Sequence, residues 1–189
     1  MLMGIPFGIG RAGGRRVLLA VTLCLALVGC GTTPPDAAIP ARAEATQGSY
    51  QLQFELSKAT WRTTEAIEGT ATLSFSGTGS VTIWSSGSGP LNFGYVEVGG
   101  TRRMGPAWTA DCAERQLSPT QPITSGLGKS GGFNGEDPNS SFYRSFFTDK
   151  DVHLSAGDWT ITAVAEFMEG TCGGPRDTLQ AAVQVHVTA

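Results

Sequence analysis

Cysteine and histidine are the side chains of this chain with the widest range of chemistry. The 189-residue sequence has two histidines, His153 and His186, and four cysteines: Cys24, Cys30, Cys112 and Cys172. A thiol can form a disulfide, bind a metal, attack a substrate or accept a chemical group. Neither histidine lies near a cysteine in the sequence, so we expect no metal site.

Cys24 lies within an apolar run near the N-terminus, and Cys30 follows that run by two residues. Arg11, Arg15 and Arg16 come first, and VLLAVTLCLALV follows at residues 17–28. A membrane-spanning helix needs roughly 20 apolar residues, whereas the apolar region of a secretory signal needs roughly 7–15. The alternative, a buried core helix, would show a polar face, and none interrupts the run. We therefore expect a signal peptide over residues 1–29, and export of the rest.

Leu27-Val28-Gly29-Cys30 ends this run. The four residues resemble the lipobox of bacterial lipoproteins. The resemblance implies lipidation of the Cys30 sulfur, cleavage before Cys30, and a mature protein anchored by membrane lipid on the extracytoplasmic side of a bacterial membrane. Arg15-Arg16 partly resembles a twin-arginine export signal, but Gly14 precedes the pair where Ser or Thr is usual. An ordinary positive leader is favoured.

Cys112 and Cys172 remain after this processing. An exported chain meets an oxidising compartment, where an even pair of cysteines favours a disulfide over two free thiols. The bond would close a loop of about 60 residues, which in the chain-entropy model stabilises the fold by roughly 4 kcal/mol.

The sequence offers no recognisable catalytic set. No nucleophile–histidine–acid grouping can be placed, and SGLGKSGG fails as a phosphate loop because Ile123 stands where its first glycine belongs. Acidic pairs occur at Glu136/Asp137 and Asp149/Asp151, but no calcium-loop spacing surrounds them. We expect a chain without cofactor or metal that is not an enzyme.

The distribution of charged residues argues against nucleic-acid binding. The three leader arginines are the only charges before Cys30, so 10 of the 13 basic residues and all 16 acidic residues follow it, giving a net charge of −6 there. No basic patch is visible. Nucleic-acid binding, which depends on neutralising phosphates, is not expected.

Alternating residues indicate the fold. Residues 30–49 are rich in Pro and Ala and lack aromatics, so we expect a lipidated Cys30 followed by a flexible linker. From Tyr50, apolar and polar residues alternate in YQLQFELS, TATLSFSG, DWTITAVAEF and LQAAVQVHVT. Gly99-Gly100 marks a hairpin turn, and SFYRSFF fits strand or helix equally. We expect an all-β, antiparallel, Ig-like sandwich of about seven strands over residues 50–189.

Leu154-Ser155-Ala156-Gly157-Asp158-Trp159-Thr160-Ile161 carries a second resemblance. It is similar to the entry of the penultimate strand in immunoglobulin-like and fibronectin III-like domains, including bacterial domains that resemble BsuPI-type proteinase inhibitors. The resemblance implies that Trp159 fills the core at a corner. It implies a fold and no activity.

Exposed aromatic side chains are the expected binding anchors. Trp84 alternates with Val81 and Ile83, so it should face away from the core, although it could also pack at the end of the sandwich. Trp61 and Trp108 are further candidate ligand-binding residues. The expected function is a non-enzymatic binding or structural module of the cell envelope, with an envelope protein or a glycan as partner. The alternative is a hydrolase or proteinase inhibitor with an unrecognised site.

Overall fold

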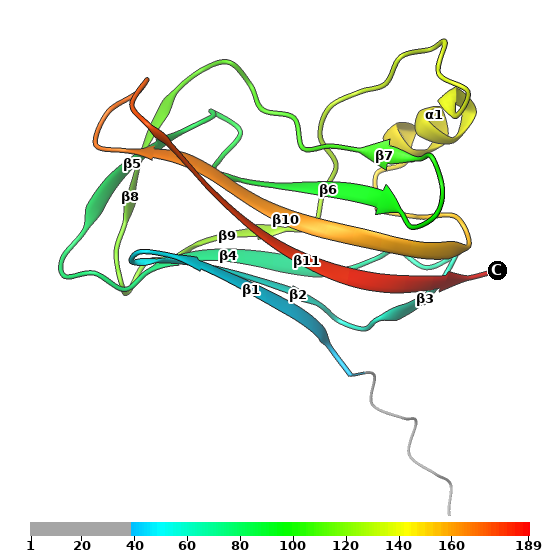
Figure 1. The fold of residues 1–189 in the computed structure, drawn as a ribbon, viewed down its shortest axis with the longest axis horizontal. Helices are drawn as coiled ribbons and strands as arrows, with labels where there is room; N and C mark the ends of the chain where they lie inside the picture. Colours follow the sequence, from blue (N-terminus) through cyan, green and yellow to red (C-terminus); the bar gives the residue numbers. More distant parts are fainter. Residues whose placement is uncertain (1–38) are drawn as a thin grey trace, which may run out of the picture. The chain divides into compact units, whose positions relative to one another are not determined.

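The computed structural model describes residues 39–189, so the expected signal peptide and Cys30 lie outside the described residues. The described chain forms two packed layers of strands with one helix at the periphery (Figure 1). Its elements are β1 (Ala41–Gln47), β2 (Tyr50–Leu56), β3 (Thr60–Arg62), β4 (Gly69–Phe75), β5 (Val81–Ser85), β6 (Leu91–Glu97), β7 (Arg103–Met104), β8 (Ala113–Leu117), β9 (Ile123–Gly126), α1 (Ser140–Thr148), β10 (Gly157–Glu169) and β11 (Arg176–Thr188).

The strands form two sheets. Sheet A has the order β1-β2-β4-β9, and sheet B has the order β3-β11-β10-β5-β8. One edge of β10 pairs first with β6 and then with β5, and β7 extends β6. All named pairs are antiparallel except β3 with β11. The predicted all-β sandwich is confirmed, with more strands than the seven expected.

Period-two alternation produces the core between the sheets. In β2 the side chains of Tyr50, Leu52, Phe54 and Leu56 are buried, while the residues between them face outward. The same alternation continues along β10 and β11. Trp159 is fully buried, and its indole N–H donates to the carbonyl of Ser155 at 3.0 Å. Trp159 therefore fills the core, as expected.

The linker expected over residues 30–49 extends too far. Residues Ala41–Gln47 form β1, which pairs with β2 along its whole length from Ala41 opposite Leu56 to Gln47 opposite Tyr50. The inward residues of β1 are alanines, which bury little apolar surface and so gave no strand signal. Backbone pairing with β2 supplies the stabilisation instead, and the folded unit includes residues before Tyr50.

Helix α1 settles the ambiguous SFYRSFF segment. Its aromatic side chains pack on the core, and Phe142 stacks on Trp159 with ring centres 5.7 Å apart. Lys129 donates to the backbone carbonyls of Phe146 and Asp149 at its C-terminal end. The glycine-rich segment around Lys129, which the sequence excludes as a phosphate loop, is thus tied to the C-terminal end of α1. Within residues 39–189, no helix has the length and apolar character that crossing a membrane requires.

Two tyrosine hydroxyls connect distant parts of the sandwich. Tyr50 donates to the Glu169 carboxylate at 2.7 Å, and Tyr95 donates to the carbonyl of Gly128. Burial, followed by the hydrogen bond to Glu169, raises the pKa of Tyr50, and burial raises the pKa of Tyr95. Each phenol therefore favours the folded state below about pH 10, and this contribution is lost as the pH rises through the folded-state pKa.

We expect an alkaline titration to reveal these two groups. The tyrosinate absorbance of Tyr50 and Tyr95 should appear only together with loss of the β-sheet circular dichroism signal, well above pH 10. Tyr50→Phe should be less stable at neutral pH, because the bond to Glu169 is lost, but should lose stability less steeply above pH 10. Titration of Tyr50 and Tyr95 near pH 10 with the sheet intact would contradict this assignment.

Candidate functional site

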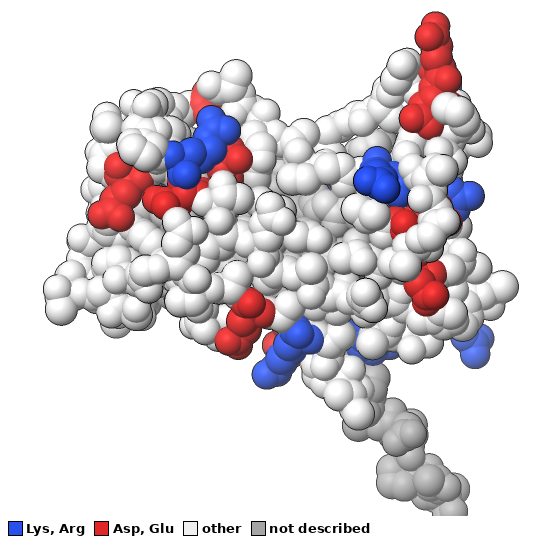
Figure 2. Space-filling model, viewed as in Figure 1, with Lys and Arg blue, Asp and Glu red and all other residues white. Residues whose placement is uncertain are grey.

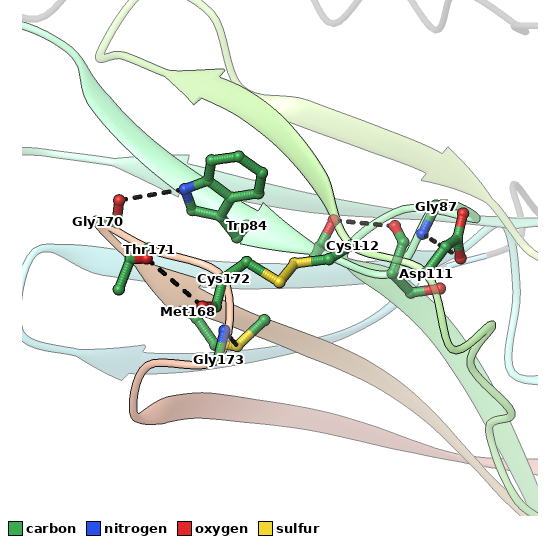
Figure 3. The surroundings of a disulfide bond; sticks show 11 residues. Trp84, Gly87, Asp111, Cys112, Met168, Gly170, Thr171, Cys172 and Gly173 are labelled. Atoms are coloured by element: carbon green, nitrogen blue, oxygen red, sulfur yellow. Dashed lines mark hydrogen bonds between the residues drawn. A yellow bond between two sulfur atoms is a disulfide. The ribbon is translucent and has the colours of Figure 1, made fainter.

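The segment between β7 and β8, residues 105–112, crosses the outer side of sheet B and is called the strap here. Its end is fixed covalently, because Cys112 forms a disulfide with Cys172 in the β10–β11 hairpin, with the Cα atoms 6.3 Å apart (Figure 3). The predicted disulfide is confirmed. It joins chain positions 60 residues apart.

Polar contacts fix the strap along its second half. The Thr109 backbone N–H donates to Ser86 Oγ at 3.0 Å, and the two hydroxyls of Ser86 and Thr109 lie 2.6 Å apart. The Gly87 N–H donates to the Asp111 carboxylate at 3.0 Å. Hydrogen bonds from the Thr109 hydroxyl and the Gly87 N–H lower the pKa of Asp111. This contact therefore holds at neutral pH and weakens as the pH falls through that lowered value.

The first half of the strap rests directly on β6. Leu91 to Tyr95 are all buried, which means that β6 is covered on both faces. At Gly94 an added Cβ would lie only 3.3 Å from Pro106 Cδ, so glycine permits this close approach. The side chain of Asn92, 8% exposed, accepts from the Phe93 N–H at 2.9 Å and donates to the carbonyl of Ala107. The Asn92 amide therefore links β6 to the strap, because it accepts from a backbone N–H of the strand and donates to a backbone carbonyl of the strap.

The strap bounds two hollows that share Trp108 and Thr109. The first has a volume of about 390 Å³ and lies between the strap and the end of β10, where Glu166 and Met168 line it. The second, about 360 Å³, lies between the strap, β6 and residues 125–131. Both fall within the range of roughly 300–1,000 Å³ that is usual for ligand pockets.

The structure separates the three candidate tryptophans. Trp61 is 4% exposed, because the pairing of β3 with β11 places it in the core. Its assignment as a ligand-binding residue is wrong. Trp84 faces away from the core, unlike its buried neighbour Ile83, and lies beside the disulfide (Figure 3). Its indole N–H donates to the carbonyl of Gly170 at 3.1 Å, so Trp84 is held against the hairpin and does not line either hollow.

Trp108 differs from the other three tryptophans in its hydrogen bonding. The indole N–H groups of Trp61, Trp84 and Trp159 each donate to a backbone carbonyl. Trp108 is half-buried, and its N–H finds no acceptor among residues 39–189. No unpaired side-chain nitrogen or oxygen is buried in this part of the chain, so this N–H is open to solvent. Trp108 thus presents a ring and an unused donor at the junction of both hollows.

Charged residues around the hollows were not foreseen from the sequence. Arg176 Nη1 lies 3.0 Å from Glu166 Oε1 across the β10–β11 pair. The alternation of apolar and polar residues along β10 could have predicted that Glu166 faces outward. That Arg176 lies diagonally across from it follows only from the β10–β11 register, in which Arg176 is opposite Met168. Arg115 donates to Ser85 Oγ and to the carbonyl of Gly87, which supports the loop under the strap.

A third hollow, of about 250 Å³, lies at α1 and contains an acid–histidine pair. Asp149 Oδ2 lies 2.8 Å from His153 Nδ1, and Ser145 and Ser155 line the same hollow. Within the described residues neither serine hydroxyl is bonded to His153, and Ser155 Oγ instead accepts from Arg102. A nucleophile–base hydrogen bond is therefore not formed here.

Comparison with known proteins gives no assignment. No protein-family model matches this chain, and no curated protein matches it either.

The first prediction for this site concerns the disulfide. Alkylation of the unreduced protein followed by peptide mapping should label neither Cys112 nor Cys172. Replacing both cysteines by serine should lower the free energy of unfolding by roughly 4 kcal/mol, because the unfolded chain regains the freedom of a long loop. It should also raise the quenching of Trp108 by acrylamide. Two alkylated cysteines before reduction would contradict the structure.

A second prediction concerns the bridging amide. Asn92→Ala should cost about 1–3 kcal/mol in urea unfolding, because it leaves a buried N–H at Phe93 and a carbonyl at Ala107 without partners. Asn92→Asp should also destabilise, since it keeps the acceptor but loses the donor. Gln180→Ala, on an exposed residue of the same sheet, is the matched control and should leave the urea midpoint unchanged. Equal midpoints for Asn92→Ala and the control would refute the bridge.

Proposed function

We propose that this chain is a lipid-anchored, extracytoplasmic protein of a bacterial membrane that binds a ligand at the strap and catalyses no reaction. The observation that carries the binding role is Trp108, a half-buried ring at the junction of two hollows with an indole N–H that has no acceptor among the described residues. Aromatic residues with a polar tip bury much area at small entropic cost and are common binding anchors.

Two observations support the location. The apolar run that ends in Leu27-Val28-Gly29-Cys30 has the length of a secretory signal and resembles a lipobox. The Cys112–Cys172 disulfide is a bond that forms and persists in oxidising compartments. A diacylglycerol on Cys30 carries two acyl chains, which hold a protein to a bilayer far more firmly than one.

The start of the described chain and the disulfide hairpin lie at opposite ends of the strands of sheet A. The described chain begins next to Ala41, at the end of sheet A where Ala41 lies opposite Leu56. β1 then runs to Gln47, whose amide donates to Asp177 near the disulfide hairpin. The Cys112 end of the strap therefore lies at the other end of the strands from the point where the described chain enters the fold (Figure 1).

The anchor has a direct test with a matched control. Expressed in a bacterium, the protein should incorporate an alkyne-tagged fatty acid and partition into the detergent phase. Cys30→Ala should abolish both, because the acceptor sulfur is lost. Cys24→Ala, which removes a thiol from the same apolar run, should leave both unchanged. A Cys30→Ala variant that still carries the label and stays in the detergent phase would refute the anchor.

A hydrolase remains the competing function because of the Asp149–His153 pair at α1. A fluorophosphonate probe distinguishes the two. The binding role predicts no labelling of Ser145 or Ser155, whereas labelling that is lost on His153→Ala would favour the hydrolase.

A further inference from the structure

We infer that the ligand of the strap is a neutral oligosaccharide that lies across Trp108, with sugar units in the hollows on either side. This inference rests on the proposed binding function and names its ligand class. Four features of the described residues lead to it. The charged side chains in the hollows have protein partners, the walls carry hydroxyl groups, the edge of β6 is covered, and Trp108 lines both hollows.

Every charged group that lines the two hollows already has a protein partner. In the first hollow Glu166 and Arg176 form an ion pair with each other, and Asp111 accepts from the Gly87 N–H. In the second hollow the ammonium of Lys129 donates to two backbone carbonyls at α1. The two acidic and the two basic side chains that line the hollows balance each other, so the lining as a whole selects neither an anionic nor a cationic ligand. These hollows favour an uncharged ligand.

The walls carry many small hydrogen-bonding groups. Hydroxyl side chains line both hollows: Ser85, Ser86, Ser88, Thr109, Ser125 and Ser130. Arg176 is 62% exposed, and its guanidinium has five N–H donors, more than one ion pair with Glu166 uses. Groups that both donate and accept suit the hydroxyls of a sugar, which do the same.

Peptide binding by strand addition is disfavoured at β6. An extended peptide would need unpaired backbone groups along a strand edge. At β6 the Phe93 N–H is already bonded to Asn92 Oδ1, and the strap covers the strand through Ala107. The edge that borders the second hollow therefore lacks a donor that such a peptide would use.

Trp108 supplies the apolar part of the recognition. One face of a pyranose ring consists of C–H groups and packs flat on an indole, while its rim carries hydroxyls that can accept from the indole N–H. Trp108 lines both hollows, and its N–H has no acceptor among residues 39–189, unlike the indole N–H groups of the other three tryptophans. In Figure 2 charged side chains lie on both sides of the hollowed upper surface and along the lower edge, and the hollowed surface itself is largely uncharged. An elongated, neutral ligand fits this surface.

The test compares the same substitution, tryptophan to phenylalanine, at two positions. Each variant loses one indole N–H. Full-length protein in detergent is titrated with cellohexaose, maltohexaose, chitohexaose and mannohexaose, with hexagalacturonate as the charged comparison, and with a random heptapeptide library. Binding is followed by tryptophan fluorescence and calorimetry. Trp108→Phe removes an unpaired donor, whereas Trp84→Phe removes one that is bonded to Gly170.

We expect at least one neutral hexaose to bind, Trp108→Phe to weaken it about tenfold with unchanged melting temperature, and Trp84→Phe to lower the melting temperature with unchanged affinity. Trp108→Ala should abolish binding. Equal affinities of Trp108→Phe and wild type would overturn the inference. Heptapeptide or hexagalacturonate binding that Trp108→Ala abolishes would overturn the saccharide assignment and leave the binding function standing. If none of these probes binds, both the saccharide assignment and the proposed binding function are wrong.

Discussion

The attachment of the strap to the outer face of sheet B is the constraint on which the rest of the site depends. A strap held only by its two ends would be a long surface connection with many conformations, and fixing it costs entropy. Three kinds of contact offset that cost at successive points: van der Waals packing of Pro106 on Gly94, the Asn92 amide under Ala107, and the Cys112–Cys172 bond. With the strap in place, the surface of sheet B gains two hollows.

The same attachment explains the unusual residues of β6. A strand with one solvent face would alternate apolar and polar residues, but β6 is buried throughout its first five positions. Its outward positions therefore need either a very small residue, Gly94, or a polar one with both hydrogen-bonding functions satisfied, Asn92. The opposite end of sheet B is covered differently, by aromatic packing of α1 and by Lys129 bonded to its last carbonyls.

Local patterns in the sequence predict the parts of this molecule that local physics determines. Alternation at Tyr50–Leu56 predicts a strand with one buried face, and the outward direction of Trp84 follows from its place beside Ile83. The even pair of cysteines that follows the expected signal peptide predicts the disulfide. β1 could not be foreseen, because its inward alanines carry almost no hydrophobic signal and its stability comes from pairing with β2.

The site itself depends on contacts between residues far apart in the chain. Trp61 and Trp108 both lie in non-periodic sequence, yet one is buried by parallel pairing with β11 and the other is left at a junction of hollows. Nothing local distinguishes them. The Glu166–Arg176 pair likewise depends on the register of β10 and β11. Tertiary packing decides which aromatic and charged groups remain available to a ligand.

Hydrogen exchange of the oxidised and reduced protein tests the central role of the strap most directly. Reduction of Cys112–Cys172 should speed exchange in the strap and in the hairpin around Cys172, while amides in the paired centre of β10 and β11 keep their protection. This result would show that the covalent clamp holds the strap on an otherwise stable sheet. Unchanged exchange in residues 105–112 after complete reduction, or equal acceleration throughout both sheets, would contradict the account.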